Sequence, residues 1–135
     1  SSEYYLENRV AINQQQRERS YTPHGRESNR RRGHIRRSRM QSLPHDLSIH
    51  DWEIAKSWFE YRCAYCLSCD CELLQEHFIP LILGGGYTKT NIVPACHSCN
   101  SSKKGKHPEK WCSQDQIERI NGFFDFVQVT EAHGH

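Results

Sequence analysis

Hydrophobic residues recur at helical spacing in the middle of the chain, directly after a polar stretch. Trp52, Ala55 and Phe59 are separated by three or four residues, the spacing that places side chains on one face of a helix. Ser48 precedes this stripe and Asp51 stands three positions later, which forms a capping box with Asp in place of the usual Glu. We therefore predict a helix that begins after Ser48 and buries these aromatic residues.

Helical patterns also occur towards both ends of the chain. Residues 3–19 contain good helix formers without Pro or Gly, and the Thr-Pro-His-Gly sequence at residues 22–25 predicts a break after them. Residues 26–40 are rich in Arg and suit either a helix on DNA or a flexible arm, which Pro44 ends. Pro108 suits the first turn of a last helix, which we expect to continue through Phe124.

Short apolar runs and turn residues alternate between the two helical regions. Residues 73–74 and 77–83 suit two short strands, and the three glycines at residues 84–86 suit a loop. Short strands between helices indicate the α+β class.

Composition limits the size of the core and the kind of protein. The chain has 135 residues, enough for one modest domain. Hydrophobic residues make up 36% and the mean hydropathy is −0.86. We therefore expect a small hydrophobic core that needs an additional stabilising cross-link. No run of about 18 apolar residues is present, and no apolar stretch opens the chain as a secretory signal would. We therefore expect no membrane span and a reducing, cytoplasmic location.

The net charge of +2 conceals an uneven distribution. Residues 1–45 hold ten Arg and four Glu, whereas residues 46–135 hold eight basic and twelve acidic residues. We therefore divide the chain into a basic N-terminal arm, 1–45, and a folded domain, 46–135. A basic arm suggests binding to nucleic-acid phosphates, although a solvated tail has the same composition. The arginines expected at DNA are Arg30, Arg31, Arg32, Arg36 and Arg37.

The cysteines suggest a metal site. Their number, seven, excludes a complete set of intrachain disulfides. Cys63 and Cys66 form one C-x-x-C unit, and Cys96 and Cys99 form a second unit after 29 intervening residues. Two such units supply four thiolates to one tetrahedral zinc ion, which is a closed structural site. Cys66 and Cys69 also form a C-x-x-C, so spacing alone leaves the register of the first unit open.

Residues that suit phosphodiester hydrolysis accompany the cysteines. Glu76 and His77 are adjacent, Asn91 lies 14 residues after His77, and Asn100 directly follows Cys99. A neutral imidazole accepts a proton from water near pH 7, and a carboxylate with an amide oxygen suits Mg²⁺ or Mn²⁺. The ordinary alternatives are a hydrogen-bonded His, a turn Asn and a helix-capping Asn.

In this order, the motifs resemble those of the HNH endonuclease family. The matching segments cover about forty residues: CAYC at 63–66, EHFIP at 76–80, GGG at 84–86, NIVPAC at 91–96 and CNSSK at 99–103. The chain is similar in particular to small phage-encoded members with a basic N-terminal region. The resemblance implies a small ββα-metal domain with structural zinc on Cys63, Cys66, Cys96 and Cys99, flanked by helices and the basic arm.

The resemblance also implies roles for the other motif residues. His77 would be the general base, and Asn91 would hold the loop and orient His77. Glu76, in place of the family's usual Asp, and Asn100, in place of the final His, would bind the catalytic Mg²⁺ or Mn²⁺. The lysines expected at the phosphate are Lys103 and Lys104.

Three positions depart from the family pattern. Glu76 is one methylene longer than Asp, and Leu67 stands where a Gly commonly follows the first zinc unit. Ile82 and Leu83 are more apolar than the residues often found before the glycines.

We expect a metal-dependent DNA endonuclease, a monomer or dimer, that nicks DNA or cuts both strands. Resemblance to the phage enzymes implies a terminase or packaging partner and the host cytoplasm as the location. A zinc-stabilised DNA-binding module without catalysis is the alternative, and the Glu76 substitution is its main support. A nuclease acting mainly on RNA is a third hypothesis, because no residue visibly marks recognition of the 2′-hydroxyl.

Overall fold

The computed structural model describes residues 22–69 and 72–133. The chain divides into two compact units, Ser1–Gly33 and His34–His135. The helix predicted over residues 3–19 lies outside the described residues, and the predicted boundary between residues 45 and 46 stays a prediction. No helix within the described ranges is long and apolar enough to span a membrane.

The Arg-rich segment is helical. Helix α2 spans Pro23–Met40, so of the two predicted conformations the helix is the one observed. Pro23 stands at its first position, where the missing N–H of Pro would have had no helical partner. The Thr22 hydroxyl accepts a hydrogen bond from the Gly25 amide at 3.0 Å. The Thr-Pro-His-Gly sequence at residues 22–25, predicted to interrupt the helical pattern, therefore lies at the start of a helix.

Helix α3, Ile49–Trp58, begins where the sequence predicted. The Asp51 amide donates to the Ser48 hydroxyl, and the Ser48 amide donates to the Asp51 carboxylate, both at 3.0 Å. This capping box fixes the start of the helix. Trp52, Ala55 and Phe59 are buried, as their spacing indicated.

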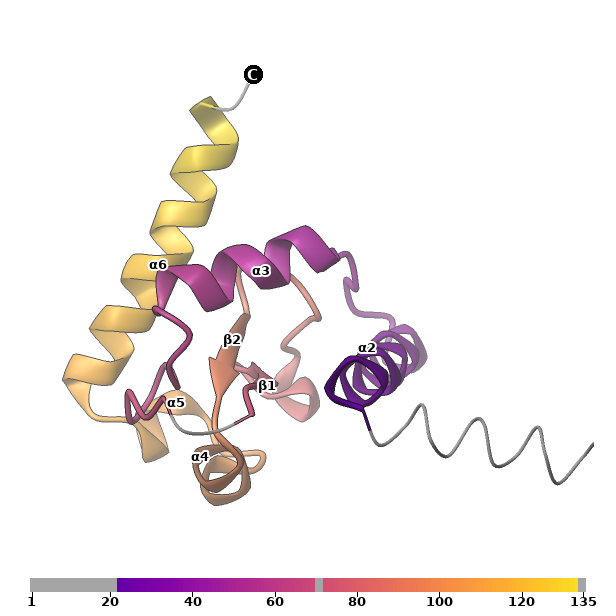
Figure 1. Cartoon of the computed structure of the whole chain (residues 1–135), viewed down its shortest axis with the longest axis horizontal. Coiled ribbons are helices and arrows are strands. Elements are labelled where there is room, and N and C mark those ends of the chain that lie inside the picture. Colours follow the sequence, from indigo (N-terminus) through magenta and orange to yellow (C-terminus); the bar gives the residue numbers. More distant parts are fainter. Residues whose placement is uncertain (1–21, 70–71, 134–135) are drawn as a thin grey trace, which may run out of the picture. The chain divides into compact units, whose positions relative to one another are not determined.

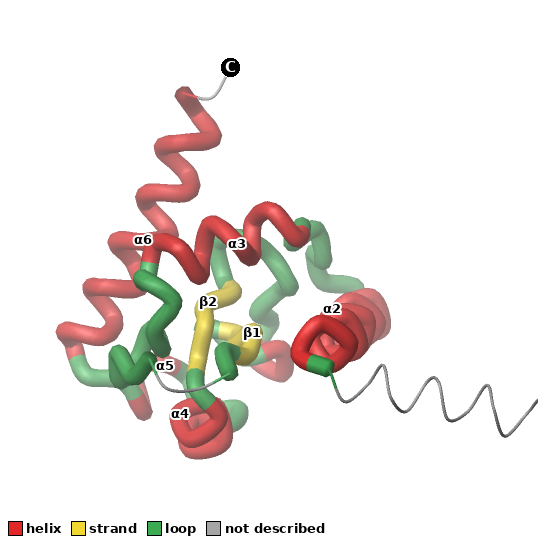
Figure 2. Tube along the Cα trace, viewed as in Figure 1, coloured by secondary structure: helices red, strands yellow, loops and turns green. Residues whose placement is uncertain are grey.

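The sheet consists of two short antiparallel strands, β1 (Leu74–His77) and β2 (Ile92–Ala95). Glu76 lies opposite Val93, and His77 lies opposite Ile92. Figure 1 shows α3 on one side of the strands and α4, His97–Lys103, on the other. The strands are much shorter than the helices, as Figure 2 makes visible. The surrounding helices and loops must therefore hold this strand pair in place.

The strand predicted over residues 77–83 is wrong. Strand β1 ends at His77, and Leu81–Leu83 form a 3₁₀ helix that closes at Gly84 with a φ of 95°. Pro80 has no N–H to give to a ladder, and a φ of this sign suits glycine because it has no Cβ. The polypeptide therefore turns back on itself between the strands.

The single helix predicted from Pro108 is interrupted. Helix α5 covers Pro108–Trp111, and helix α6 runs over Gln114–His133. At the junction, the Gln116 amide donates to the Ser113 hydroxyl at 3.2 Å, and the Ser113 amide donates to the Gln116 side chain at 2.7 Å. This reciprocal cap starts a new helix with a new direction.

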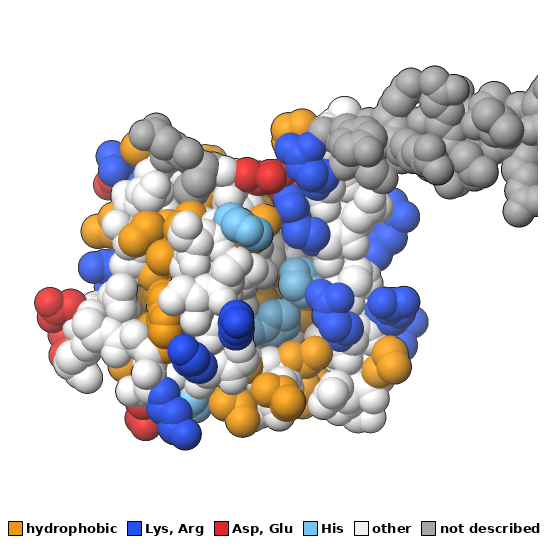
Figure 3. Space-filling view, turned by 90° about the horizontal axis from the view of Figure 1, so that it is seen from below, with side chains coloured by type: hydrophobic (Ala, Val, Ile, Leu, Met, Phe, Trp, Pro, Cys, Tyr) orange, Lys and Arg blue, Asp and Glu red, His pale blue; other side chains and the backbone are white. Residues whose placement is uncertain are grey.

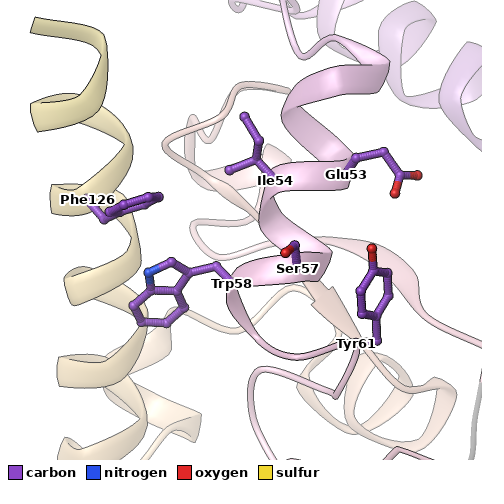
Figure 4. Close-up of a pocket in the computed structure, with 6 residues that line it drawn as sticks. All are labelled: Glu53, Ile54, Ser57, Trp58, Tyr61 and Phe126. Atoms are coloured by element: carbon purple, nitrogen blue, oxygen red, sulfur yellow. The ribbon is translucent and has the colours of Figure 1, made fainter. Parts of the chain in front are cut away.

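Helices α3 and α6 pack through aromatic side chains. The Phe59 and Phe123 rings lie 5.2 Å apart, and Trp58 lies 5.4 Å from Phe123. At the edge of this contact, Trp58 and Phe126 border a shallow groove between the two helices (Figure 4). Among the described residues, the largest fully buried apolar and aromatic side chains are Trp52, Tyr87, Phe123, Leu47, Ile92 and Ile120.

Candidate metal centre and active site

The four cysteines of the two C-x-x-C units come together. The Sγ atoms of Cys63, Cys66, Cys96 and Cys99 all lie within 4.8 Å of one another. Cys66 Sγ and Cys96 Sγ are 3.7 Å apart. Two sulfurs at about 2.3 Å from a shared tetrahedral zinc ion would be about 3.8 Å apart, so the donor set fits zinc. The four cysteines predicted as ligands are therefore positioned to bind a metal ion, and Cys69 is outside the cluster.

Backbone contacts bring the two cysteine units side by side. The Ala64 amide donates to the Pro94 carbonyl at 2.8 Å, which attaches the first unit to the end of β2. The second unit begins at Cys96, which caps α4: the Cys99 amide donates to Cys96 Sγ at 3.4 Å. The first unit is thus tied to the strand that leads directly into the second unit.

Helix α6 holds the first unit from the other side. Gln116 donates to the Tyr65 carbonyl at 3.0 Å, and Arg119 donates to the Ala64 carbonyl at 2.8 Å. Leu67, just after the first unit, has a φ of 62°. This is a conformation for which glycine, with no Cβ, is suited.

Glu76 lies at the centre of a buried triad with Tyr65 and Lys103. The Tyr65 hydroxyl donates to Glu76 Oε2, and Lys103 Nζ lies 3.2 Å from Glu76 Oε1. Lys103 also donates to the His77 carbonyl at 3.0 Å. Burial raises the pKa of Glu76, while the Lys103 charge and the Tyr65 hydrogen bond oppose this rise. The triad joins the first cysteine unit, β1 and α4.

The triad changes the interpretation of two predicted site residues. Lys103 was expected at a DNA phosphate, but it is fully buried and its ammonium group faces Glu76. Glu76 was expected to bind the catalytic cation, but each carboxylate oxygen already has a partner. In this arrangement, both residues bind each other rather than the ligands that the sequence suggested.

The His77 imidazole is set apart from the triad. Its ring lies 5.2 Å from His34 and 6.3 Å from Tyr87, measured between centroids. Its Nε2 atom is buried and has no hydrogen-bond partner among the described residues. Burial, and then the charges of Arg37 and Lys103, lower the pKa of His77 to about 4. The ring is therefore neutral at pH 7, and Nε2 retains an unused hydrogen-bonding capacity.

Asn91 holds the loop between the strands. Its side chain accepts from the Ile79 amide at 2.8 Å and donates to the carbonyls of Ile79 and Gly86 at 3.0 and 2.9 Å. A Cβ at Gly85 would lie 1.7 Å from the Ile79 carbonyl oxygen and 2.7 Å from Asn91 Nδ2. The loop can pass this close to Asn91 only because residue 85 is glycine.

The remaining predicted site residues lie on α4, on its following turn and on α2. Asn100 is half-buried in α4, and Lys104 is exposed at the end of that helix. Arg36 and Arg37 are exposed on the part of α2 that belongs to the second unit. The part of α2 in the first unit carries Arg30, Arg31 and Arg32.

Sequence reasoning missed three side chains around the site. His34 and Tyr87 flank the His77 ring, and Tyr65 donates to Glu76. Arg37 donates to His34 at 3.0 Å, with the roles of the ring nitrogens set by the tautomer. His34 lies in the Arg-rich segment and Tyr65 between two cysteines, so a stronger local pattern concealed each of them.

The HNH endonuclease family model matches residues 63–115, which is less than half of the chain. Comparison with curated proteins found no match, and comparison with solved structures found none. The matched range contains all four clustered cysteines together with His77, Asn91 and Asn100. Helices α2 and α3 lie outside it.

Proposed function

Residues 63–115 match the HNH endonuclease family model, and from this premise we propose that the protein hydrolyses DNA phosphodiester bonds with His77 as general base. The observation that carries the proposal is the buried His77 Nε2 atom, which has no partner among the described residues. Buried polar atoms are rarely left without a hydrogen bond, and the exceptions often mark a functional site. Here, the missing partner is the attacking water.

The surroundings of His77 suit proton transfer. A neutral imidazole accepts the proton of a water molecule that attacks phosphorus, and Nε2 is the nitrogen that is free to do so. In the free protein the pKa of His77 is lowered to about 4. A phosphodiester placed beside the ring adds a negative charge, which raises this pKa towards the working pH. Substrate binding thus strengthens the base.

We assign Glu76 and Lys103 to positioning. Lys103 holds both the Glu76 carboxylate and the His77 carbonyl, so the backbone of the base is anchored from α4. Asn91 anchors the other side of the loop through Ile79 and Gly86. Two independent anchors limit movement of the segment that carries the base, as a preorganised site requires.

A catalytic cation fits only part of the predicted donor set. Asn100 offers an amide oxygen from α4, whereas the Glu76 carboxylate is engaged by Tyr65 and Lys103. We therefore propose Asn100 as the protein ligand for Mg²⁺ or Mn²⁺ and leave Glu76 out of that role. When bound, such an ion supplies charge stabilisation for the leaving oxygen. The four-cysteine cluster is proposed to hold zinc and to act in folding only.

Basic side chains near His77 suit the DNA backbone. Arg37 is exposed and close enough to lower the pKa of His77, so a phosphate at His77 would also meet its guanidinium group. We include Arg36 and Lys104 in the same role, and Arg30, Arg31 and Arg32 as further contacts from α2. The terminase or packaging partner, the phage origin and the host-cytoplasm location rest on resemblance alone and stay predictions.

The test is nicking of supercoiled plasmid with and without added Mg²⁺ or Mn²⁺. His77→Ala is compared with His50→Ala, which removes an exposed histidine on α3. We expect metal-dependent open circles from the wild type and from His50→Ala, and a loss of at least 100-fold in His77→Ala with DNA binding retained. Unchanged nicking by His77→Ala would remove His77 as the base.

The second candidate is a DNA-binding module without catalysis. The observation in its favour is the engaged Glu76 carboxylate, since an HNH site without a free acidic ligand has fewer groups for a cation. Gel shifts that show duplex binding, together with no nicking under either metal, would select this candidate. Nicking would exclude it.

A further inference from the structure

We propose that Ile82 and Leu83 form an apolar tip that inserts between DNA bases beside the bond that is cut. The proposal rests on the proposed function and names how the same site handles its substrate. Ile82 is 77% exposed and Leu83 is 52% exposed, although both are large aliphatic residues in a chain with a thin core. Exposed aliphatic side chains next to each other at a functional site suggest an interaction surface.

The tip is held by backbone hydrogen bonds, which suits side chains that insert between bases. It lies in the 3₁₀ helix Leu81–Leu83, which starts after Pro80 and ends at Gly84. The amides of Leu83 and Gly85 both donate to the Pro80 carbonyl, at 2.9 and 3.0 Å. With the Asn91 side chain bonded to both ends of this loop, little conformational entropy would be lost when the tip enters DNA.

The tip lies beside basic residues and on the segment that carries the candidate base. A Cβ at Gly105 would lie 3.6 Å from Ile82 Cγ2, so the tip is adjacent to the turn after α4. The residues on either side of Gly105, Lys104 and Lys106, are exposed. In Figure 3, hydrophobic side chains lie next to histidine and lysine or arginine side chains on one face.

This combination of charges and apolar surface favours nucleic acid as the occupant. Phosphates on either side of a groove would meet Lys104 and Lys106 while the aliphatic tip contacts bases. Proteins that bind the minor groove often insert Ile or Leu at a base step, which partially unstacks the bases and kinks the duplex. The kinked step would be bound by the same segment that carries His77, six residues before Leu83.

The experiment places 2-aminopurine, whose fluorescence rises when it is unstacked, at successive positions of a duplex. The duplex is one that the wild type binds in a gel shift, and no Mg²⁺ or Mn²⁺ is added. We expect a fluorescence rise of at least threefold with the full-length wild type at adjacent positions, which lie next to the cut when cleavage of the same duplex is mapped separately. The rise should be lost in Ile82→Ala/Leu83→Ala and retained in Ile49→Ala, which removes an exposed aliphatic residue from α3.

The same variants are then assayed for nicking, melting temperature and oligomeric state. We expect the tip variant to melt like the wild type, because its side chains are exposed, and to nick at least tenfold more slowly. Ile82→Met/Leu83→Met keeps an apolar tip and should retain most of the fluorescence rise.

The outcomes separate this proposal from the proposed function. A rise in 2-aminopurine fluorescence without nicking would support insertion of the tip and overturn the proposed nuclease activity. Nicking without a rise in fluorescence would overturn insertion alone. A wild type that binds no duplex would overturn both. A tip variant that changes the oligomeric state and leaves fluorescence intact would make these residues a protein contact and would overturn insertion.

Discussion

At the scale of single residues, His77 is held as a neutral imidazole by its surroundings. Burial is the main cause, and the charges of Arg37 and Lys103 add to it, so the pKa falls to about 4. A lowered pKa means that the ring stays unprotonated as the pH falls, until the pH passes through that value. The proposed base is therefore unprotonated over the whole neutral range.

We expect kcat/KM for cleavage to be flat from about pH 8 to pH 5 and to fall below that, because kcat/KM reports the free enzyme. Arg37→Gln removes a nearby positive charge, which should raise the pKa of His77 and move the fall to higher pH. The shapes of the two pH profiles are compared, since Arg37 also has a proposed DNA contact. Circular dichroism at each pH monitors folding. If the two pH profiles have the same midpoint, Arg37 does not lower the pKa of His77.

A second prediction concerns Leu67, whose φ is 62°. The left-handed conformation costs a residue with a Cβ about 1–2 kcal/mol, whereas glycine adopts it readily. The side chain is 41% exposed, so its removal costs little packing. Leu67→Gly should therefore raise the free energy of unfolding by up to about 1 kcal/mol, measured by urea denaturation at fixed zinc. Leu67→Ala keeps the strained backbone and should not be stabilised; equal gains in both variants would argue against strain.

At the scale of secondary-structure elements, the buried triad joins β1 to α4. Lys103→Met leaves the Glu76 carboxylate buried beside one hydrogen-bond donor, and breaking a buried ion pair costs about 3–5 kcal/mol. Lys103→Met/Glu76→Gln removes both charges and should recover at least half of that loss. Chemical denaturation of the two variants measures the difference. If the double variant is no more stable than Lys103→Met, the unpaired charge is not the cause.

The elements that could be predicted well from the sequence are those determined by residues close together along the chain. The Ser48–Asp51 capping box and both C-x-x-C units depend on residues three positions apart, and their geometry is as expected. The burial of Lys103 depends on Glu76, 27 residues earlier, and on Tyr65 beyond it. Such a partner cannot be inferred from a local pattern, so a lysine near the end of a helix looked like a phosphate contact.

Two element boundaries were wrong for a similar reason. The apolar run from His77 to Leu83 suits a strand, but Pro80 and the left-handed Gly84 turn it back. The reciprocal cap between Ser113 and Gln116 interrupts the last predicted helix, although both halves are helical. The hydrophobic pattern indicated burial correctly for the last helix, whereas Ile82 and Leu83 at the end of the first run are exposed. In both cases the direction of the backbone depended on polar and conformational signals.

At the scale of the whole molecule, the cysteine cluster connects three parts of the domain. The first unit is bonded to β2 through Ala64 and to α6 through Gln116 and Arg119, while Cys96 starts α4. Loss of the metal would therefore disturb the helices on both sides of the sheet. The core is small, and structural zinc contributes folding energy directly.

Cys96→Ser should lose the metal and unfold most of residues 34–135. Cys69→Ser, at a cysteine outside the cluster, is the matched control and should melt like the wild type. Zinc content from elemental analysis and thermal melting by circular dichroism provide the two readouts. A Cys96→Ser protein that retains one zinc and the wild-type melting temperature would contradict the assignment.

Both strands lie between Cys66 and Cys96, which places them inside the loop that a bound ion closes. Closing a loop of this length costs about 3–4 kcal/mol in chain entropy. Pairing of two four-residue strands offsets little of this cost. Structural zinc binding contributes about 10–16 kcal/mol in small domains, which exceeds this cost. With zinc as the proposed ion, we expect the strand that carries His77 to become stable in a newly synthesised chain only once the ion is bound.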